Sequence, residues 1–140
     1  MAEDAFGAIV AALARGDRTS FELEQRLLQT GFDPAACADA LVRASEAGYL
    51  DDARVAGERA RRLADRGSSD AGIRAELERR GLDEEGIEAA LAAVAPEALR
   101  AERLATRLGG GVRAARALAR KGFPEDVVER AARLPIAEEP

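Results

Sequence analysis

Three stretches of fifteen residues share one pattern and decide the fold: LEQRLLQTGFDPAAC (23–37), IRAELERRGLDEEGI (73–87) and AARALARKGFPEDVV (114–128). Each has a leucine four residues before a central glycine and a large apolar residue directly after it. The central glycines are Gly31, Gly81 and Gly122. Helix-forming residues dominate before each glycine, and a glycine in the left-handed conformation commonly closes a helix. We therefore predict that each stretch ends one helix and begins the next.

Residues typical of helix starts support these boundaries. Thr19 and Glu22 fit a capping box, in which a hydroxyl and a carboxylate each satisfy a free backbone amide. Asp33 precedes Pro34, and Asp83 precedes two glutamates, which places carboxylates at the positive end of a helix dipole. No segment alternates β-branched and polar residues, so we expect helices and no strands.

The recurrence of this pattern predicts internal repeats. A further helix is expected before each stretch, at residues 3–15, 52–66 and 97–108, which gives three helices per copy. We assign the repeats to residues 1–50, 51–95 and 96–134, followed by a flexible tail at residues 135–140. A copy this small buries little apolar surface alone, so neighbouring copies should pack on each other. The predicted fold is all-α, with three tandem three-helix repeats in an elongated, gently curved array.

The composition excludes several classes of protein function. The chain of 140 residues has no histidine and a single cysteine, Cys37, so it cannot build a zinc site of Cys and His ligands. Nucleophilic triads that need histidine are excluded for the same reason. We predict that the protein is not an enzyme and that it uses no metal or other cofactor.

The first residues and the lone cysteine indicate where the protein acts. Residues 1–4 (MAED) are acidic where a secretory signal would be basic, and no apolar run is long enough to cross a bilayer. A single cysteine cannot form an intrachain disulfide, which favours a reducing compartment. We expect a cytoplasmic protein without membrane contact.

Basic residues are concentrated towards the C-terminus. Residues 1–50 carry four basic and eight acidic residues, whereas residues 96–140 carry nine and seven. Helical spacing places three arginines on one face of each of two successive helices. These stripes are Arg100, Arg103 and Arg107, followed by Arg113, Arg116 and Arg120. Arginine stripes bind a phosphate backbone or an acidic protein surface, and they also occur on faces that meet only solvent. From the residues alone a solvated face is the simpler interpretation, and we treat the two stripes as candidates for contact with a partner.

Three residues of the first two copies are further partner candidates: Tyr49, Arg54 and Arg74. Tyr49 is the only tyrosine, and it either packs between the first two repeats or stands exposed as an anchor for a partner. The adjacent carboxylates of Asp51 and Asp52 suggest a metal site, but their place directly before a helix makes helix capping the simpler interpretation.

The stretch GYLDDARVA at residues 48–56 resembles the Gly-Tyr-Leu-Asp-Asp-x-Arg-x-Ala signature of the RecX family of recombination regulators. The frame around it, in residues 22–32 and 73–82, is also similar, and the order of these elements matches over residues 5–133. The positions that carry the resemblance are Gly31, Gly48, Leu50, Asp51, Asp52, Gly81 and Gly122.

This resemblance implies a regulatory function. RecX proteins are built from tandem three-helix repeats and bind the RecA recombinase, above all its filament on single-stranded DNA. They modulate, and usually inhibit, recombination, ATP hydrolysis and the DNA-damage (SOS) response. The resemblance implies that the RecA filament is the partner of this chain. We expect a monomer that makes weak direct DNA contact through the third repeat.

Two other functions fit a protein made of short helical units. A helix-turn-helix regulator of duplex DNA needs a basic recognition helix in a symmetric dimer, whereas a generic helical-repeat adaptor needs only exposed faces. The basic faces here are concentrated in one terminal copy, and the whole chain has a net charge of −5. Because this charge repels free DNA, we favour a partner that contains protein as well as DNA.

Overall fold

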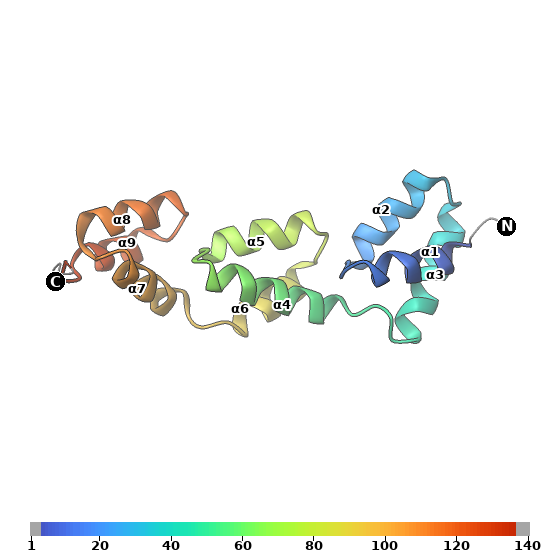
Figure 1. Ribbon diagram of the computed structural model, residues 1–140, viewed down its shortest axis with the longest axis horizontal. Coiled ribbons are helices and arrows are strands. Elements are labelled where there is room, and N and C mark those ends of the chain that lie inside the picture. Colours follow the sequence, from blue (N-terminus) through green and yellow to red (C-terminus); the bar gives the residue numbers. More distant parts are fainter. Residues whose placement is uncertain (1–3, 137–140) are drawn as a thin grey trace.

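The computed structural model describes residues 4–136, and within them the chain forms only helices and loops (Figure 1). The helices are α1 (Ala5–Ala14), α2 (Ser20–Thr30), α3 (Pro34–Glu46), α4 (Asp52–Asp65), α5 (Asp70–Arg79), α6 (Glu84–Ala92), α7 (Glu97–Arg107), α8 (Gly111–Arg120) and α9 (Glu125–Ala132). The prediction of an all-α fold is confirmed. Residues 1–3, where the first predicted helix begins, and residues 137–140 of the predicted tail lie outside the described part.

Each run of three helices encloses its own apolar core, and we call these runs the first, second and third helix groups. The largest fully buried apolar side chains are Ile9, Leu23 and Cys37 in α1–α3, Ile73, Leu77 and Ile87 in α4–α6, and Leu118 in α7–α9. Many other core positions are alanine, whose small side chain lets helices approach closely. This grouping is consistent with three-helix repeats, and it explains how so alanine-rich a chain folds.

The three helix groups follow one another in a row, from α1–α3 at one end to α7–α9 at the other (Figure 1). The second helices of the groups, α2, α5 and α8, lie along the same side of this row (Figure 1). The start of α2 therefore lies near the end of α5, and the start of α5 lies near the end of α8. These meetings of helix ends form the junctions between groups.

The helix ends are formed largely by the residues that the sequence pattern marks. The predicted capping box is present, because the Glu22 amide donates to Thr19 Oγ1 (3.2 Å) and the Thr19 amide donates to Glu22 Oε1 (3.0 Å). Gly31 closes α2 in the left-handed conformation, with φ of 104°. Asp33 takes the predicted position before Pro34, but its side chain makes no capping hydrogen bond.

The first junction joins α2 to the second helix group by two hydrogen bonds. The buried Thr19 hydroxyl donates to the carbonyl oxygen of Arg80 at the end of α5, over 2.6 Å. The amide of Ser20 donates to the carboxylate of Asp52, the first residue of α4, over 2.8 Å. The positive end of the α2 dipole thus faces the negative end of the α5 dipole, which favours this arrangement.

Glycine is required at Gly81 by this junction as well as by the helix end. Gly81 has φ of 83°, and a Cβ there would collide with the ring of Phe21 from α2. The corresponding Gly31 in the first group has no such neighbour within 4 Å. Gly31 is therefore needed only to end its helix, whereas Gly81 both ends its helix and allows Phe21 to pack closely against it.

The second junction repeats the hydrogen bonds of the first. The buried Ser69 hydroxyl donates to the carbonyl oxygen of Lys121 at the end of α8, over 2.8 Å. The amide of Asp70 donates to the carboxylate of Glu97, the first residue of α7, over 2.6 Å. Each junction therefore combines a buried hydroxyl on a helix end with a carboxylate on a free helix amide.

The start of α8 is closed differently. Gly110 stands where Thr19 and Ser69 precede α2 and α5, and a Cβ there would collide with the carbonyl oxygen of Pro135. A Cβ on Gly111 would lie 2.8 Å from Ile136 Cγ1. Residues 135–136 of the predicted tail therefore pack against the start of α8.

Candidate functional site

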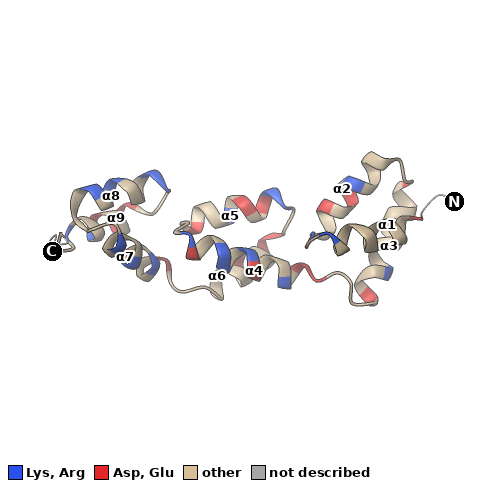
Figure 2. Cartoon of the chain, in the orientation of Figure 1, with Lys and Arg blue, Asp and Glu red and all other residues tan. Residues whose placement is uncertain are grey.

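Positive charge gathers on the third helix group. Figure 2 shows basic residues along α7 and α8, and α8 carries three arginines and no acidic residue. In α5, by contrast, three acidic residues accompany two arginines. The third group is therefore the part of the row best suited to an acidic partner.

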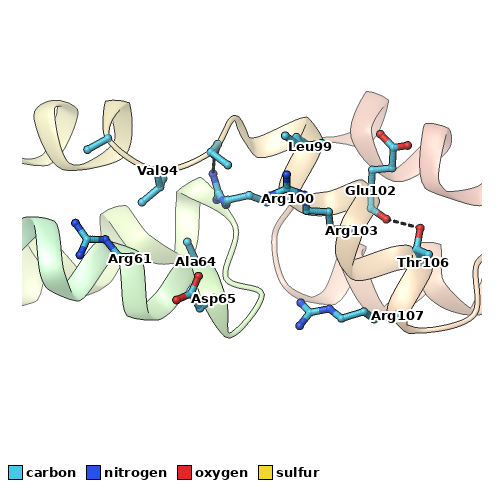
Figure 3. Close-up of a pocket in the computed structure, with 12 residues that line it drawn as sticks. Arg61, Ala64, Asp65, Val94, Leu99, Arg100, Glu102, Arg103, Thr106 and Arg107 are labelled. Carbon is cyan, nitrogen blue, oxygen red and sulfur yellow. Dashed lines mark hydrogen bonds between the residues drawn. The ribbon is translucent and has the colours of Figure 1, made fainter.

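A groove of about 780 Å³ lies between the second and third helix groups (Figure 3). Its volume falls within the range of ligand-binding clefts. One wall is α4, with Arg61, Ala64 and Asp65, and the loop before α7 adds Ala93, Val94 and Ala95. The other wall is α7, with Leu99, Arg100, Glu102, Arg103, Thr106 and Arg107. We call this cleft the arginine groove.

Arg100 lies in the second junction and is only 8% exposed, so burial argues against the predicted contact of Arg100 with a partner. Its guanidinium donates to the carbonyl oxygens of Ala95 (2.9 Å) and Ser68 (3.1 Å), and it lies 2.9 Å from the Asp70 carboxylate. Helical spacing shows which residues share a face, but not which part of the face meets another helix group. Arg100 therefore holds the two groups together.

Three other arginines of the groove are exposed to solvent: Arg61, Arg103 and Arg107. None of them forms an ion pair within residues 4–136. Figure 3 shows Arg61 on the α4 wall and Arg107 on the α7 wall. The groove thus presents unpaired arginines from two helix groups, and the carboxylates of Asp65 and Glu102 also lie in its lining.

The second predicted stripe, Arg113, Arg116 and Arg120, is exposed on α8 as expected. These side chains also lack an ion pair in the described part of the chain. Their role in partner binding stays a prediction.

Arg54 and Arg74 are held in ion pairs. Arg54 hydrogen-bonds the carboxylates of Asp17 (3.1 Å) and Glu58 (3.3 Å), and the bond to Asp17 is the main reason that the pKa of Arg54 is raised. Arg74 pairs with two glutamates of α6, and its hydrogen bond to Glu88 lowers the pKa of that carboxyl group. Both charges are compensated within the chain, so a partner would have to compete with these carboxylates.

Tyr49 packs within the first helix group. Its ring meets Phe6 of α1 edge-on, with ring centroids 5.9 Å apart, and the residue remains 49% exposed. The prediction that Tyr49 packs between the first two repeats finds no support in this contact. Because about half of Tyr49 is exposed, the alternative, that it serves as an anchor for a partner, stays a prediction.

Asp51 and Asp52 have different partners. Asp51 caps α4 by accepting a hydrogen bond from the Arg54 amide (3.0 Å), whereas Asp52 accepts from Ser20 across the first junction. The capping interpretation therefore holds for Asp51 alone. Within the described residues, no cluster of His, Cys, Asp or Glu has the makings of a metal site.

A smaller groove of about 400 Å³ lies at the first junction. Four arginines line it, but Arg59 pairs with Glu76 (3.1 Å) and Arg80 lies 3.6 Å from the Glu22 carboxylate. We call it the paired groove because of these two pairs; its other arginines, Arg18 and Arg62, form no ion pair in the described residues. No helix in residues 4–136 is long and apolar enough to span a membrane.

Sequence reasoning missed the residues that build the junctions. Thr19 was expected only to cap a helix, and Ser69 was not singled out. A signal was present, because each stands twelve residues before a central glycine, Gly31 or Gly81. A buried hydroxyl that recurs at one position of a repeat indicates an interface between copies.

No family model matches the chain. The chain is 36% identical over 134 residues to regulatory protein RecX of Xanthomonas axonopodis pv. citri, covering 89% of this chain and 83% of that protein. It is 34% identical over 131 residues to regulatory protein RecX of Stenotrophomonas maltophilia, covering 86% and 80%.

Two crystal structures share this fold. The structure of a regulatory protein RecX superposes with a TM-score of 0.75 at 22% identity, over 89% of this chain and 68% of that one. The structure of RecX from Lactobacillus salivarius superposes with a TM-score of 0.79 at 18% identity, over 91% of both chains. These structures share the all-helical arrangement of the chain.

Proposed function

The chain belongs to the RecX family of regulatory proteins, and from that premise we propose that it binds the RecA recombinase on single-stranded DNA and inhibits it. The inhibited activities would be ATP hydrolysis, recombination and induction of the DNA-damage response. The observation that carries the proposal is sequence similarity that extends over most of this chain and of its relatives.

The shape and charge of the chain fit a non-catalytic regulator. A row of three helix groups can contact several subunits of a filament at once, and the junctions keep the groups in register. We propose that the protein acts as a cytoplasmic monomer, without cofactor or catalysis, by occupying and bridging filament subunits.

The third helix group is the proposed contact with the filament. Its α8 stripe is exposed and uncompensated, while the net charge of −5 for the whole chain disfavours tight binding to free DNA. Direct DNA contact would therefore be weak and confined to this group. A protein surface beside the DNA can supply the remaining affinity.

The proposal is tested by binding to RecA filaments on single-stranded DNA, with ATP hydrolysis measured in parallel. Arg113→Glu combined with Arg116→Glu should weaken filament binding about tenfold, because both charges would repel an acidic surface. The matched control is Arg15→Glu combined with Arg26→Glu, which makes the same charge change in the first group and should alter binding less than about threefold.

The outcomes separate the alternatives. A wild-type chain that neither binds the filament nor changes ATP hydrolysis would contradict the proposed function. Equal binding by both double variants would leave the α8 stripe as a solvated surface. Tight, sequence-dependent binding to bare duplex DNA would favour a helix-turn-helix regulator instead.

A further inference from the structure

We infer that the arginine groove binds an acidic polypeptide segment that carries a large apolar side chain. The inference goes beyond the proposed function, since it concerns the chemistry of one cleft and does not require the recombinase. It rests on the charges at the rim of the groove, on its apolar floor, and on contrast with the paired groove.

The rim supplies the attraction for carboxylates. Arg61, Arg103 and Arg107 are exposed, reach the groove from two helices, and lack ion pairs within residues 4–136 (Figure 3). Arginine presents several donors in a plane, which suits hydrogen bonding to carboxylates. Beneath them the Nε of the buried Arg100 has no hydrogen-bond partner in the described chain.

The floor supplies a place for an apolar side chain. Ala64, Val94 and Leu99 line the groove, and Leu99 is 38% exposed although it is a large apolar residue. An apolar anchor surrounded by charged contacts at the rim is the usual arrangement of a peptide-binding site. The combination therefore favours a ligand with both acidic and apolar groups.

Nucleic acid fits this groove less well than a polypeptide. Asp65 and Glu102 stand among the lining residues, and their carboxylates repel phosphates and ligand carboxylates alike, but a sugar-phosphate backbone has no donor to offer them. They can instead accept hydrogen bonds from peptide amides. The apolar floor also offers nothing to a sugar-phosphate chain.

The paired groove shows that this arrangement is not a general property of the junctions. There Arg59 and Arg80 are already matched by carboxylates of the chain, and Val55 is the one large apolar residue that lines it. Two of its four arginines are thus matched, whereas Arg18 and Arg62 form no ion pair in the described part of the chain. What the first junction lacks is the exposed apolar floor of the arginine groove.

The test is fluorescence anisotropy with a labelled twelve-residue peptide of glutamates and aspartates that contains two leucines. The wild-type chain should bind it saturably, and Arg61→Glu combined with Arg107→Glu should weaken binding at least about tenfold. Arg15→Glu combined with Arg26→Glu makes the same charge change in the first helix group, outside the groove, and should weaken binding less than about threefold. Replacing both leucines of the peptide by serine should weaken binding about fivefold.

Several results would overturn the inference. These are absence of saturable binding, equal loss in the two double variants, and competition by oligothymidylate as effective as that by unlabelled peptide. Helical circular dichroism checks folding, and Arg103→Gln, with about threefold weaker binding expected, replaces any reversal variant that unfolds. Normal filament binding by a chain that does not bind the peptide would overturn this inference and leave the proposed function standing.

Discussion

The two junctions share their backbone contacts but differ in charge. At each one a buried hydroxyl meets the last carbonyl of a neighbouring helix, and a carboxylate accepts from a free helix amide. Around the first junction the chain supplies carboxylates for most of its arginines, whereas around the second three arginines remain uncompensated. A larger share of the positive charge is therefore paired within the chain at the first junction, and the second has more charge available to a partner.

This difference separates residues that hold the row together from residues that are free to bind. Arg100 and Arg103 lie on the same helix and in the same groove, yet Arg100 is buried among three acceptors and Arg103 faces solvent. Satisfied polar groups stabilise a fold, whereas exposed unpaired charge contributes little to stability. The four predictions that follow test this separation.

The largest loss of stability is expected from Arg100→Val. Val55 holds the corresponding position at the first junction, three residues after the helix start, so the change gives the second junction the side chain of the first. It leaves the carbonyl oxygens of Ser68 and Ala95 without donors and should lower the free energy of unfolding by about 3 kcal/mol. Urea unfolding measures this change in the free energy of unfolding.

Arg103→Val is the matched control on the same helix, and it should cost less than about 0.5 kcal/mol because the side chain is exposed. Similar losses for the two variants would show that Arg100 is not a junction residue.

A smaller difference is expected between two glycine variants. Gly31→Ala should cost about 1 kcal/mol, because alanine is strained in the left-handed conformation. Gly81→Ala should cost about 2 kcal/mol, because its Cβ must also displace Phe21. Thermal unfolding distinguishes the two variants. Equal losses would mean that Phe21 moves aside freely and that the contact adds nothing.

Removing the junction hydroxyls tests whether the junctions are equivalent. Thr19→Val and Ser69→Ala should each cost about 1.5 kcal/mol, since each removes a helix cap and a buried hydrogen bond. Chemical denaturation gives the two values. A loss of stability in only one variant would show that the two junction hydroxyls do not play equivalent roles.

Lowering the pH should destabilise the first junction before the second, and we expect this to be the smallest of the four changes in stability. Hydrogen bonds from Arg79 and Arg59 lower the pKa of Glu76, and a bond from Arg54 lowers that of Asp17. A carboxyl group whose pKa is lower in the folded state than in the unfolded state stabilises the fold at pH values above its unfolded pKa, which is ordinarily 4.5 for Glu76. This stabilisation is lost as the pH falls through the pKa of the folded state. Asp17 is half exposed and the Glu76 side chain is 21% exposed, so solvent screens both ion pairs and about 1 kcal/mol of stability is at stake.

Hydrogen exchange at pH 3 to 5 would show this as faster opening of α2 and the start of α4 than of α8. Opening of α8 first would contradict the assignment of compensated charge to the first junction.

The helices, their ends and the three-group arrangement follow closely from the sequence because they depend on local chemistry. Capping at Thr19 and termination at Gly31 involve residues within one turn of each other. The spacing of core residues around each central glycine likewise reports on one helix group at a time. These features needed no knowledge of how the groups meet.

The junctions were harder to predict because their partners lie far apart in sequence. Thr19 reaches a carbonyl 61 residues away, and Ser69 reaches one 52 residues away. Helical spacing placed Arg100 and Arg103 on one face, but burial of that face by a neighbouring group determines which arginine is free. The groove exists only once two groups are docked, so no single stretch of sequence describes it.

Hydrogen exchange of the whole chain, alone and bound to RecA filaments on single-stranded DNA, tests the central claim most directly. The account predicts that the filament slows exchange in residues 96–134 and at the α4 wall of the arginine groove, with little change in residues 4–50. Protection centred on α1–α3, or no protection anywhere, would contradict it.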